Sequence, residues 1–246
     1  MNDATKTEIF GVKFDNLLPQ AACQHFLELA ETADASMVFT PNPEMVMLAR
    51  KDAEFKALLN SADLLVPDGV GIVWASKFTE NPMKQRVAGI ELIQNAFADE
   101  RAKNFKWYFL GAKPGIAQLA AEKMAQTYEI QVVGARDGYF SAEDEDEVNA
   151  EIAASGADIV LVGLGFPRQE RWIFANKDKA GARLYIGCGG SLDVLSGQIK
   201  RAPKIFRKMK LEWFWRLLRQ PSRIWRQRVL LKFVLAVLFR KKRGVL

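Results

Sequence analysis

Residues 158–170 read DIVLVGLGFPRQE, and this stretch decides the fold. The run DIVLVG is apolar at successive positions, so a strand formed by it would bury both of its faces. The glycines and the proline that follow end the strand, and the polar residues RQE then suit the start of a helix. A strand that is buried on both faces and leads into a helix is typical of a parallel sheet covered by helices.

The same pattern recurs on either side of this stretch. Further runs rich in β-branched and aromatic residues predict strands at residues 36–40, 63–67, 106–110, 130–134 and 183–188. Helices are predicted between them, over residues 43–60, 89–101, 114–127 and 142–155. We therefore expect a Rossmann-like α/β fold with a mostly parallel sheet and helices on both faces. A short hairpin near residue 11 could precede it.

Composition excludes several classes of protein. The 246 residues are 49% hydrophobic and 26% charged, which is ordinary for a globular protein and excludes a mainly disordered chain. Two cysteines are too few for a disulfide framework, and a single histidine, His25, argues against a multi-histidine metal site and a histidine-based triad. The N-terminal residues contain no apolar signal segment, so we expect a cytoplasmic protein.

The net charge of +6 is unevenly distributed along the chain. Residues 201–246 contain 15 basic residues and one acidic residue, whereas residues 1–200 contain 20 basic and 28 acidic residues. We therefore predict an α/β domain over residues 1–200 and a basic helical appendage over residues 201–246. The appendage should bind anions, and a nucleic acid, an anionic lipid surface or a nucleotide-type substrate would each qualify.

The appendage also contains the apolar run VLLKFVLAVLF, residues 229–239. This run is shorter than the roughly 20 residues that a membrane-spanning helix needs. Apolar residues beside many lysines and arginines suit a helix that lies on an anionic membrane surface, and an oligomer contact is the alternative.

Polar, glycine-rich loops follow four of the predicted strands. They read TPNPE at residues 40–44, PDGVG at 67–71, GLGFPRQE at 163–170 and GCGGSLD at 187–193. Ligands of open parallel sheets bind beyond the carboxyl ends of the strands, where such loops bring backbone N–H groups close to phosphate oxygens. One such loop is usually only a tight turn, but four at one edge favour a ligand site. Neither a Walker A motif nor a dinucleotide fingerprint is present. Candidate ligand-binding residues in the last two loops are Gly163, Gly165, Pro167, Gly189 and Gly190.

Asp68 is the candidate general base. A proline and a glycine flank it in a sharp turn that would point the carboxylate away from the strand end, and no histidine is available to accept a proton there. Capping of the helix that begins near Gly69 is an equally open interpretation. Thr40 and Asn42 could bind a polar ligand, although a turn before the next proline is favoured by the residues alone.

Three more candidates lie in the last two loops, and a further set lies in the appendage. Arg168 and Gln169 stand at a helix start, where they would either bind a ligand or form a surface pair. Asp193 could accept a hydrogen bond from a base or a ribose hydroxyl, or cap the next turn. The helical spacing of the appendage arginines places them close to one face: Arg216, Arg219, Arg223 and Arg226.

Taken together and in order, eight stretches resemble the WecG/TagA/CpsF glycosyltransferases, from about residue 8 to residue 228. They are TPNPEMV, ADLLVPDGVGIVWAS, RVAGIEL, FLGAKPG, VVGARDGYF, VGLGFPRQE, GCGGSLDVLSG and RAPKIFRKMKLEWFWRLLRQPSRIWR. The resemblance implies transfer of a ManNAc- or ManNAcA-type sugar from a UDP donor to an undecaprenyl-diphosphate-linked GlcNAc. It further implies an inverting reaction without a bound metal or cofactor. The place of action would be the inner face of the bacterial plasma membrane, in the synthesis of cell-surface polysaccharide.

The resemblance also assigns roles to individual residues. Asp68 corresponds to the proposed general base of the family, Thr40 and Asn42 to its T-x-N pair, Gln169 to the glutamine of its G-x-P-x-Q-E motif, and Asp193 to an aspartate near the uridine. The appendage arginines that the family associates with the diphosphate correspond to Arg216, Arg223 and Arg226. The appendage could thus neutralise the leaving UDP and dock on the bilayer, as a lid triggered by the membrane.

Two other functions stay open at this level. The basic tail with Trp213, Trp215 and Trp225 would suit a nucleic-acid-binding protein, but that function leaves the four polar loops unused. A nucleotide-dependent oxidoreductase is disfavoured because the dinucleotide fingerprint is missing. If the donor sugar carries a carboxylate, Arg86 or Arg136 could bind it, but the sequence places neither.

Overall fold

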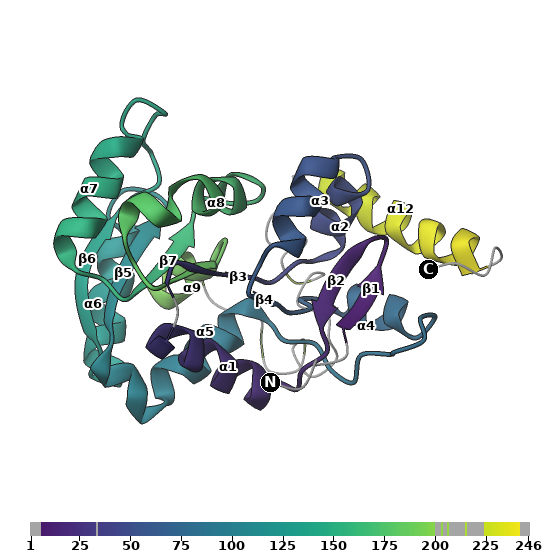
Figure 1. The fold of residues 1–246 in the computed structure, drawn as a ribbon, viewed down its shortest axis with the longest axis horizontal. Helices are drawn as coiled ribbons and strands as arrows, with labels where there is room; N and C mark the ends of the chain where they lie inside the picture. The colour runs from purple at the N-terminus through teal and green to yellow at the C-terminus, as the bar shows by residue number, and fades with distance from the viewer. Residues whose placement is uncertain are drawn as a thin grey trace.

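The structure, a computed structural model, describes residues 6–32, 34–199 and 224–241, together with Pro203, Phe206 and Trp215. Within residues 224–241 it describes the side chains of residues 228–239. At its centre lies a sheet of six strands (Figure 1), and every neighbouring pair is parallel. In order across the sheet the strands are β4 (Leu64–Leu65), β3 (Ser36–Phe39), β8 (Leu184–Gly187), β7 (Ile159–Gly163), β5 (Lys106–Gly111) and β6 (Gln131–Arg136). All six predicted strands are confirmed, with ends shifted by one or two residues.

Helices cover both faces of this sheet, as predicted. One layer consists of α1 (Pro19–Thr32), α5 (Gly89–Ala98), the 3₁₀ helix η1 (Glu100–Asn104), α6 (Ile116–Tyr128) and α9 (Ser191–Leu195). The other consists of α2 (Pro43–Ala49), α3 (Ala53–Asn60), α4 (Val70–Ser76), α7 (Glu145–Ser155) and α8 (Arg168–Ala180). Successive residues of a strand point to opposite faces of the sheet and pack in two separate cores. Met37 and Phe39 face one helix layer, while Val38 faces the other.

Two predicted helices are shorter than the sequence indicated. The helix expected over residues 43–60 is two helices, because the side chain of Asp52 accepts the backbone N–H of Phe55 at 2.9 Å and begins α3. The helix expected over residues 89–101 ends at Ala98, and Asp99 caps η1 in the same way. The N-terminal hairpin is confirmed as β1 (Lys6–Ile9) and β2 (Val12–Asp15), an antiparallel pair beside α4.

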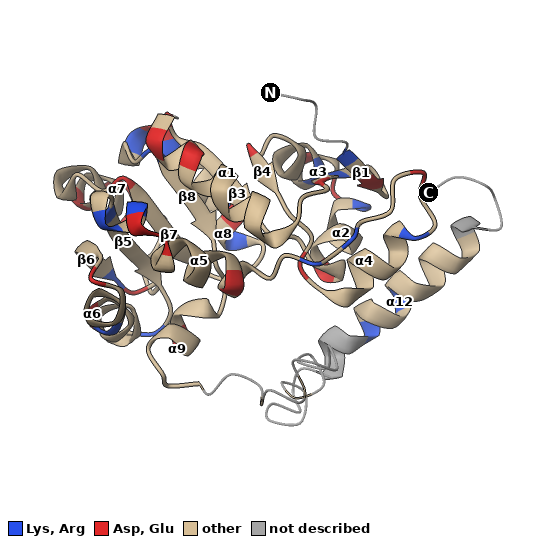
Figure 2. Cartoon of the chain, turned by 90° about the horizontal axis from the view of Figure 1, so that it is seen from below, with Lys and Arg blue, Asp and Glu red and all other residues tan. Residues whose placement is uncertain are grey.

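The apolar run of the appendage forms part of α12 (Ile224–Lys241), which packs on α2 and α4 (Figures 1 and 2). Phe233 and Val237 are fully buried in the same core as the sheet, and the ring of Phe233 meets that of Phe10 edge-on at a centroid distance of 5.9 Å. The opposite face of the helix is exposed and also apolar: Leu231, Leu235, Leu238 and Phe239. One side of the helix therefore belongs to the protein core, and contact with a membrane by the exposed side stays a prediction.

Within the described residues, no helix combines the length and the apolar character that crossing a bilayer requires. The boundary predicted at residue 200 stays a prediction, although α12 shares a core with the domain before it.

Candidate active site

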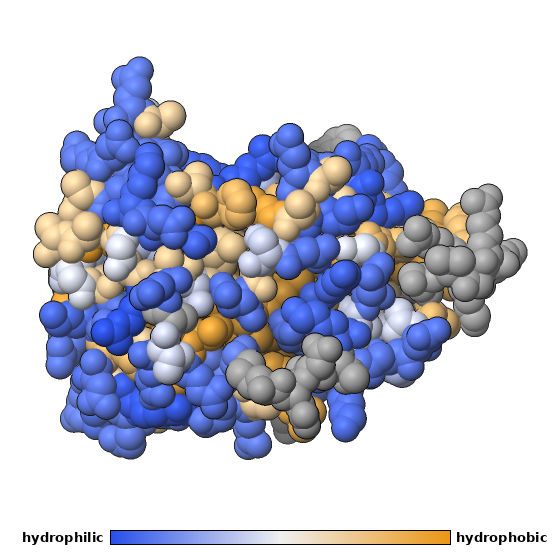
Figure 3. Space-filling view, viewed as in Figure 1, coloured by the Kyte–Doolittle hydropathy of each residue, from blue (hydrophilic) through white to orange (hydrophobic). Residues whose placement is uncertain are grey.

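The four polar loops lie side by side at one edge of the sheet. They follow β3, β4, β7 and β8, and these strands are neighbours in the order β4-β3-β8-β7. Because the strands are parallel, all four carboxyl ends meet at the same edge. The structure thus confirms the predicted convergence. Hydrophobic residues gather in the middle of the face shown in Figure 3, between hydrophilic regions on either side.

Asp68 lies where the chain beyond β4 meets the start of α5. Its backbone N–H donates to the carbonyl of Pro41 at 3.1 Å, which ties the loop after β4 to the loop after β3. Its Oδ2 accepts a long hydrogen bond of 3.4 Å from the backbone N–H of Gly89. Since Gly89 is the first residue of α5, the half-buried carboxylate faces the positive end of that helix dipole.

This geometry bears on the capping interpretation of Asp68, while its role as a base stays a prediction. The helix directly after it, α4, has Gly69 as its N-cap and no side-chain capping bond, so Asp68 does not cap its own helix. Thr40 lies beside the same turn of α5, because a Cβ added to Gly89 would come within 2.9 Å of the Thr40 Oγ1. Thr40 and Asp68 are therefore brought together around Gly89, as a joint role in a site requires.

Asn42 uses its side-chain oxygen for local structure. Its Oδ1 accepts the backbone N–H groups of Glu44 at 2.8 Å and Met45 at 3.1 Å, which caps α2. The turn that the residues alone favoured is confirmed. A ligand contact by Asn42 would therefore have to come from its Nδ2.

Residues 86–88, which lead into α5, also reach the candidate site, although the sequence analysis gave them little weight. The backbone N–H of Val87 donates to the carbonyl of Pro67 at 2.9 Å, so this segment runs along the strand end that carries Asp68. Arg86 precedes it, with its Nη2 3.9 Å from Glu91 Oε1. Arg136 instead pairs with two glutamates of α7 at the end of β6, the edge strand farthest from β4. Of the two arginines, the structure places Arg86 near Asp68.

Gln169 and Glu170 form a buried brace beneath the loop after β8. Gln169 Oε1 accepts the backbone N–H of Gly189 at 2.9 Å, and its Nε2 donates to Glu170 Oε1 at 2.7 Å. Glu170 is 1% exposed, and its Oε2 has no hydrogen-bond partner among the described residues. Burial raises the pKa of Glu170 to about 7. In this structure the amide of Gln169 thus supports the glycine loop.

Arg168 is likewise engaged with the protein. Its Nη1 donates to the carbonyl of Gly138 at 2.9 Å and its Nη2 to that of Phe140 at 2.8 Å. The guanidinium also lies over the ring of Phe140, 4.6 Å from the centroid. The side chain therefore holds the loop after β6, and ligand binding by Arg168 stays a prediction.

The glycines of the last two loops divide into packed and open positions. A Cβ at Gly163 would come within 2.9 Å of Leu192 and 3.0 Å of the carbonyl of Gly189, so that close approach needs a glycine. Gly165 and Gly189 adopt positive φ of 78° and 52° with open space where a side chain would be. Pro167 stands at the start of α8, Gly190 is the N-cap of α9, and Asp193 lies half-buried in the first turn of α9.

Comparison with known proteins agrees with this arrangement. The sequence profile of the glycosyl transferase WecG/TagA/CpsF family matches residues 7–245. The chain belongs to this family. A relative from Bacillus spizizenii is 37% identical over 204 residues, which cover 82% of this chain and 79% of the relative. A relative from Staphylococcus aureus strain MRSA252 is 34% identical over 227 residues, covering 92% and 89%, and one from Bacillus subtilis strain 168 is 34% identical over 208 residues, covering 84% and 80%. All three are named N-acetylglucosaminyldiphosphoundecaprenol N-acetyl-beta-D-mannosaminyltransferase.

Membership of this glycosyltransferase family confirms the enzyme prediction and outweighs the nucleic-acid and oxidoreductase alternatives. The appendage arginines are only partly placed. Arg216 and Arg223 lie outside the described residues, and so does the side chain of Arg226 in α12. The helix α12 itself packs on α2 and α4, which follow the Thr40 and Asp68 loops. A Cβ at Gly71 in α4 would lie 3.9 Å from the ring of Phe233. The described end of the appendage is thus beside the candidate site.

No three Cys, His, Asp or Glu side chains gather as a metal site in the part of the chain that the structure describes. Metal-independent transfer stays a prediction.

Proposed function

We propose that this protein transfers an N-acetylmannosamine-type sugar from a UDP donor to an N-acetylglucosamine that is linked to a polyprenyl diphosphate. The reaction would belong to the synthesis of a bacterial cell-surface polysaccharide. The observation that carries the proposal is Asp68, held by Gly89 at the start of α5 and adjoining Thr40 at an edge where four loops converge. The names of the relatives supply the substrates by analogy.

In this mechanism Asp68 is the general base. Its carboxylate accepts the proton of the acceptor hydroxyl while that oxygen attacks the anomeric carbon of the donor sugar. The bond from the anomeric carbon to the UDP oxygen breaks on the opposite side, so the configuration at this carbon inverts. Asp68 then releases its proton to water. Thr40, beside the same turn of α5, is placed to orient the reacting groups.

The leaving UDP carries negative charge that must be stabilised. The open loop at Gly165 and the start of α8, a helix of 13 residues, offer backbone N–H groups and a positive dipole end, whereas the N–H of Gly189 is already bonded to Gln169. Arg86, which precedes the residue that bonds to Pro67 beside Asp68, would add a positive charge. Arg216, Arg223 and Arg226 would complete this set without a bound metal.

We further propose that the exposed face of α12 attaches the protein to the inner surface of the plasma membrane. Leu231, Leu235 and Leu238 are spaced four and three apart, with Arg228 and Lys232 next to them. An apolar stripe flanked by cations suits the interface of an anionic bilayer, which is where a polyprenyl-linked acceptor would lie. The buried face of the same helix holds it against the body.

The reaction is tested by a transfer assay with a water-soluble alkyl-diphosphate-GlcNAc analogue and a panel of UDP-sugars. We expect turnover with UDP-ManNAc or UDP-ManNAcA, product of inverted anomeric configuration by NMR, and no loss of rate in EDTA. Absence of transfer with every UDP-sugar would overturn the function. Loss of turnover in EDTA would overturn the metal-independent mechanism.

Membrane attachment is tested by sedimentation with vesicles that contain anionic lipid. The double variant Leu235→Glu/Leu238→Glu should bind at least tenfold more weakly, because two exposed apolar side chains are replaced by negative charges. The matched control is Leu119→Glu, a leucine of α6 that is 37% exposed and lies outside the appendage. Equal binding by the double variant and the control would contradict the proposed attachment.

A further inference from the structure

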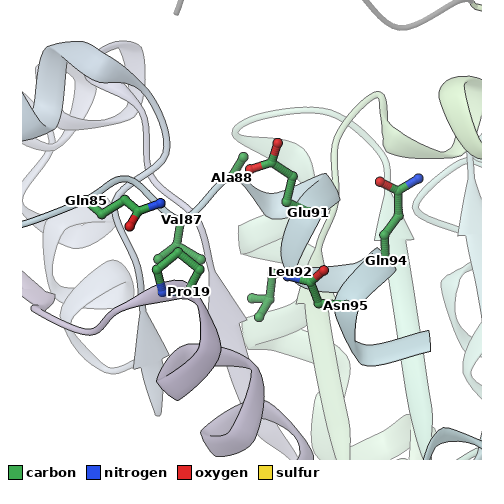
Figure 4. Close-up of a pocket in the computed structure, with 8 residues that line it drawn as sticks. All are labelled: Pro19, Gln85, Val87, Ala88, Glu91, Leu92, Gln94 and Asn95. Atoms are coloured by element: carbon green, nitrogen blue, oxygen red, sulfur yellow. The ribbon is translucent and has the colours of Figure 1, made fainter. Parts of the chain in front are cut away.

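A cavity of about 340 Å³ opens between the start of α1, the segment of residues 85–88 and the first turns of α5 (Figure 4). Its polar lining comes from the amides of Gln85, Gln94 and Asn95 and the carboxylate of Glu91. Val87 and Leu92 contribute apolar surface. Val87, Glu91 and Leu92 belong to the stretch RVAGIEL, which carries part of the family resemblance, but no role has been assigned to them.

Chain direction places this cavity at the edge of the sheet that carries the candidate site. The helices α1 and α5 each run back towards the amino ends of the strands, so both of them begin at the carboxyl edge. Ala88 forms part of the cavity wall, and the next residue, Gly89, donates its N–H to Asp68. One wall of the cavity is therefore continuous with the segment that holds the candidate base.

The lining chemistry suits an uncharged, hydroxyl-rich ring. Amide side chains both donate and accept hydrogen bonds, and a carboxylate accepts them from hydroxyl groups. None of the residues that line the cavity is basic, and Glu91, whose Oε1 lies 3.9 Å from Arg86 Nη2, adds no positive charge to the lining. Pockets for drug-sized ligands run from about 300 to 1,000 Å³, so a cavity of about 340 Å³ suits one ring rather than a nucleoside diphosphate.

The order of the strands indicates which sugar this ring belongs to. The open glycine loops that suit the UDP follow β7 and β8, whereas Asp68 follows β4 at the other end of the row β4-β3-β8-β7. The cavity lies on the Asp68 side. A ring seated there would lie next to the segment that holds the base, as an attacking acceptor must.

We propose that this cavity binds the acetamido sugar of the acceptor and presents its hydroxyl to Asp68. The inference rests on the proposed function, because it takes Asp68 as the base and a lipid-linked acetamido sugar as the acceptor. Gln85 and Asn95 are specificity-determining residues in this scheme, since they are exposed amides from opposite walls of the cavity (Figure 4).

The test is the double variant Gln85→Ala/Asn95→Ala, compared with Gln126→Ala, an exposed amide of α6 that does not line the cavity. Both double-variant positions are exposed, so folding should be preserved and is checked by thermal unfolding. With the alkyl-diphosphate-GlcNAc analogue we expect the KM for acceptor to rise about tenfold, which corresponds to the loss of two ordinary hydrogen bonds. The KM for the UDP-sugar should not change, and Gln126→Ala should match the wild type.

Two kinetic results would overturn the inference. A rise in the KM for the UDP-sugar alone would assign the cavity to the donor ring, and unchanged values for both substrates would remove it from recognition. A second readout does not need turnover: saturation-transfer NMR of the same analogue should weaken in the double variant and persist in Gln126→Ala. If the wild type transfers no sugar, the proposed function fails, while this binding measurement still decides the inference.

Discussion

The two ends of the functional edge use their polar residues in opposite ways. At the β3–β4 end, Asp68 and Thr40 gather around the start of α5, and the carboxylate bonds to a helix N–H. At the β7–β8 end, Arg168 and Gln169 direct their side chains to backbone groups of neighbouring loops. This end therefore presents mainly backbone to a ligand, at Gly165 and at the start of α8, because Gln169 already binds the N–H of Gly189.

This difference teaches that loops of similar composition can serve different purposes. The reaction needs one side chain that accepts a proton, and it also needs N–H groups that hold a diphosphate. In the proposed mechanism Asp68 would supply the first. The loop at Gly165 and the start of α8 would supply the second. Substitutions at the two ends would test this division.

Asp68→Asn should lower kcat by about 10²- to 10⁴-fold, because the amide cannot accept the proton of the acceptor hydroxyl. UDP affinity, measured by calorimetry, should stay within twofold of the wild type, since the nucleotide is assigned to the other end. The matched control is Asp34→Asn, an exposed aspartate before the amino end of β3. Unchanged turnover in Asp68→Asn would show that Asp68 is not the general base, and the proposed difference between the two ends of the edge would fail.

Glu170→Gln should remove a pH dependence of stability. The pKa of Glu170 is raised to about 7 in the folded protein from a model-peptide value of 4.5, so the folded state binds the proton more tightly than the unfolded state. The wild type should therefore lose stability relative to the variant as pH rises from about 4.5 to about 7, by an amount on the order of 2 kcal/mol. Urea unfolding of both proteins across this range measures it. Parallel curves would show that Glu170 titrates normally.

Arg168→Met should cost about 1–2 kcal/mol of unfolding free energy, because two hydrogen bonds to loop carbonyls and the contact with Phe140 are lost. The KM for the UDP-sugar should change less than threefold. Denaturant unfolding and steady-state kinetics separate the two effects. If Arg168→Met is as stable as the wild type but has a much higher KM for the UDP-sugar, Arg168 binds the donor.

Gly165→Ala should cost about 1 kcal/mol of stability, since φ is +78° and the space around the missing side chain is open. It should also weaken UDP binding, because a methyl group would cover the backbone assigned to the diphosphate. Gly181→Ala is the matched control: its φ is +71°, its surroundings are equally open, and it follows the far end of α8. Equal UDP affinity in the two variants would remove Gly165 from the nucleotide site.

Much of this architecture could be predicted from local sequence. The six strands follow from short runs of β-branched and aromatic residues between helical stretches, and their parallel arrangement follows from burial on both faces. The edge where ligands bind then follows from topology alone. The helix breaks at Asp52 and Asp99 were missed, because a capping aspartate inside a helical pattern resembles an ordinary surface residue.

For the candidate site, the sequence could predict which residues lie at the edge of the sheet but not what their side chains contact. Which residues stand at the edge depends on strand ends, and the sequence by itself determined that Thr40, Asp68, Gly163 and Gly189 would be there. What each side chain does depends on partners 20 to 30 residues away, such as Gly89 for Asp68 and Gly138 for Arg168. The same limit applies to α12. Its apolar sequence predicts that the helix buries side chains, but it does not say that one face packs on α2 and α4 while the other stays exposed. Only the tertiary structure decided these roles, because hydrogen bonds and packing form between segments whose separation along the chain leaves no periodic signal.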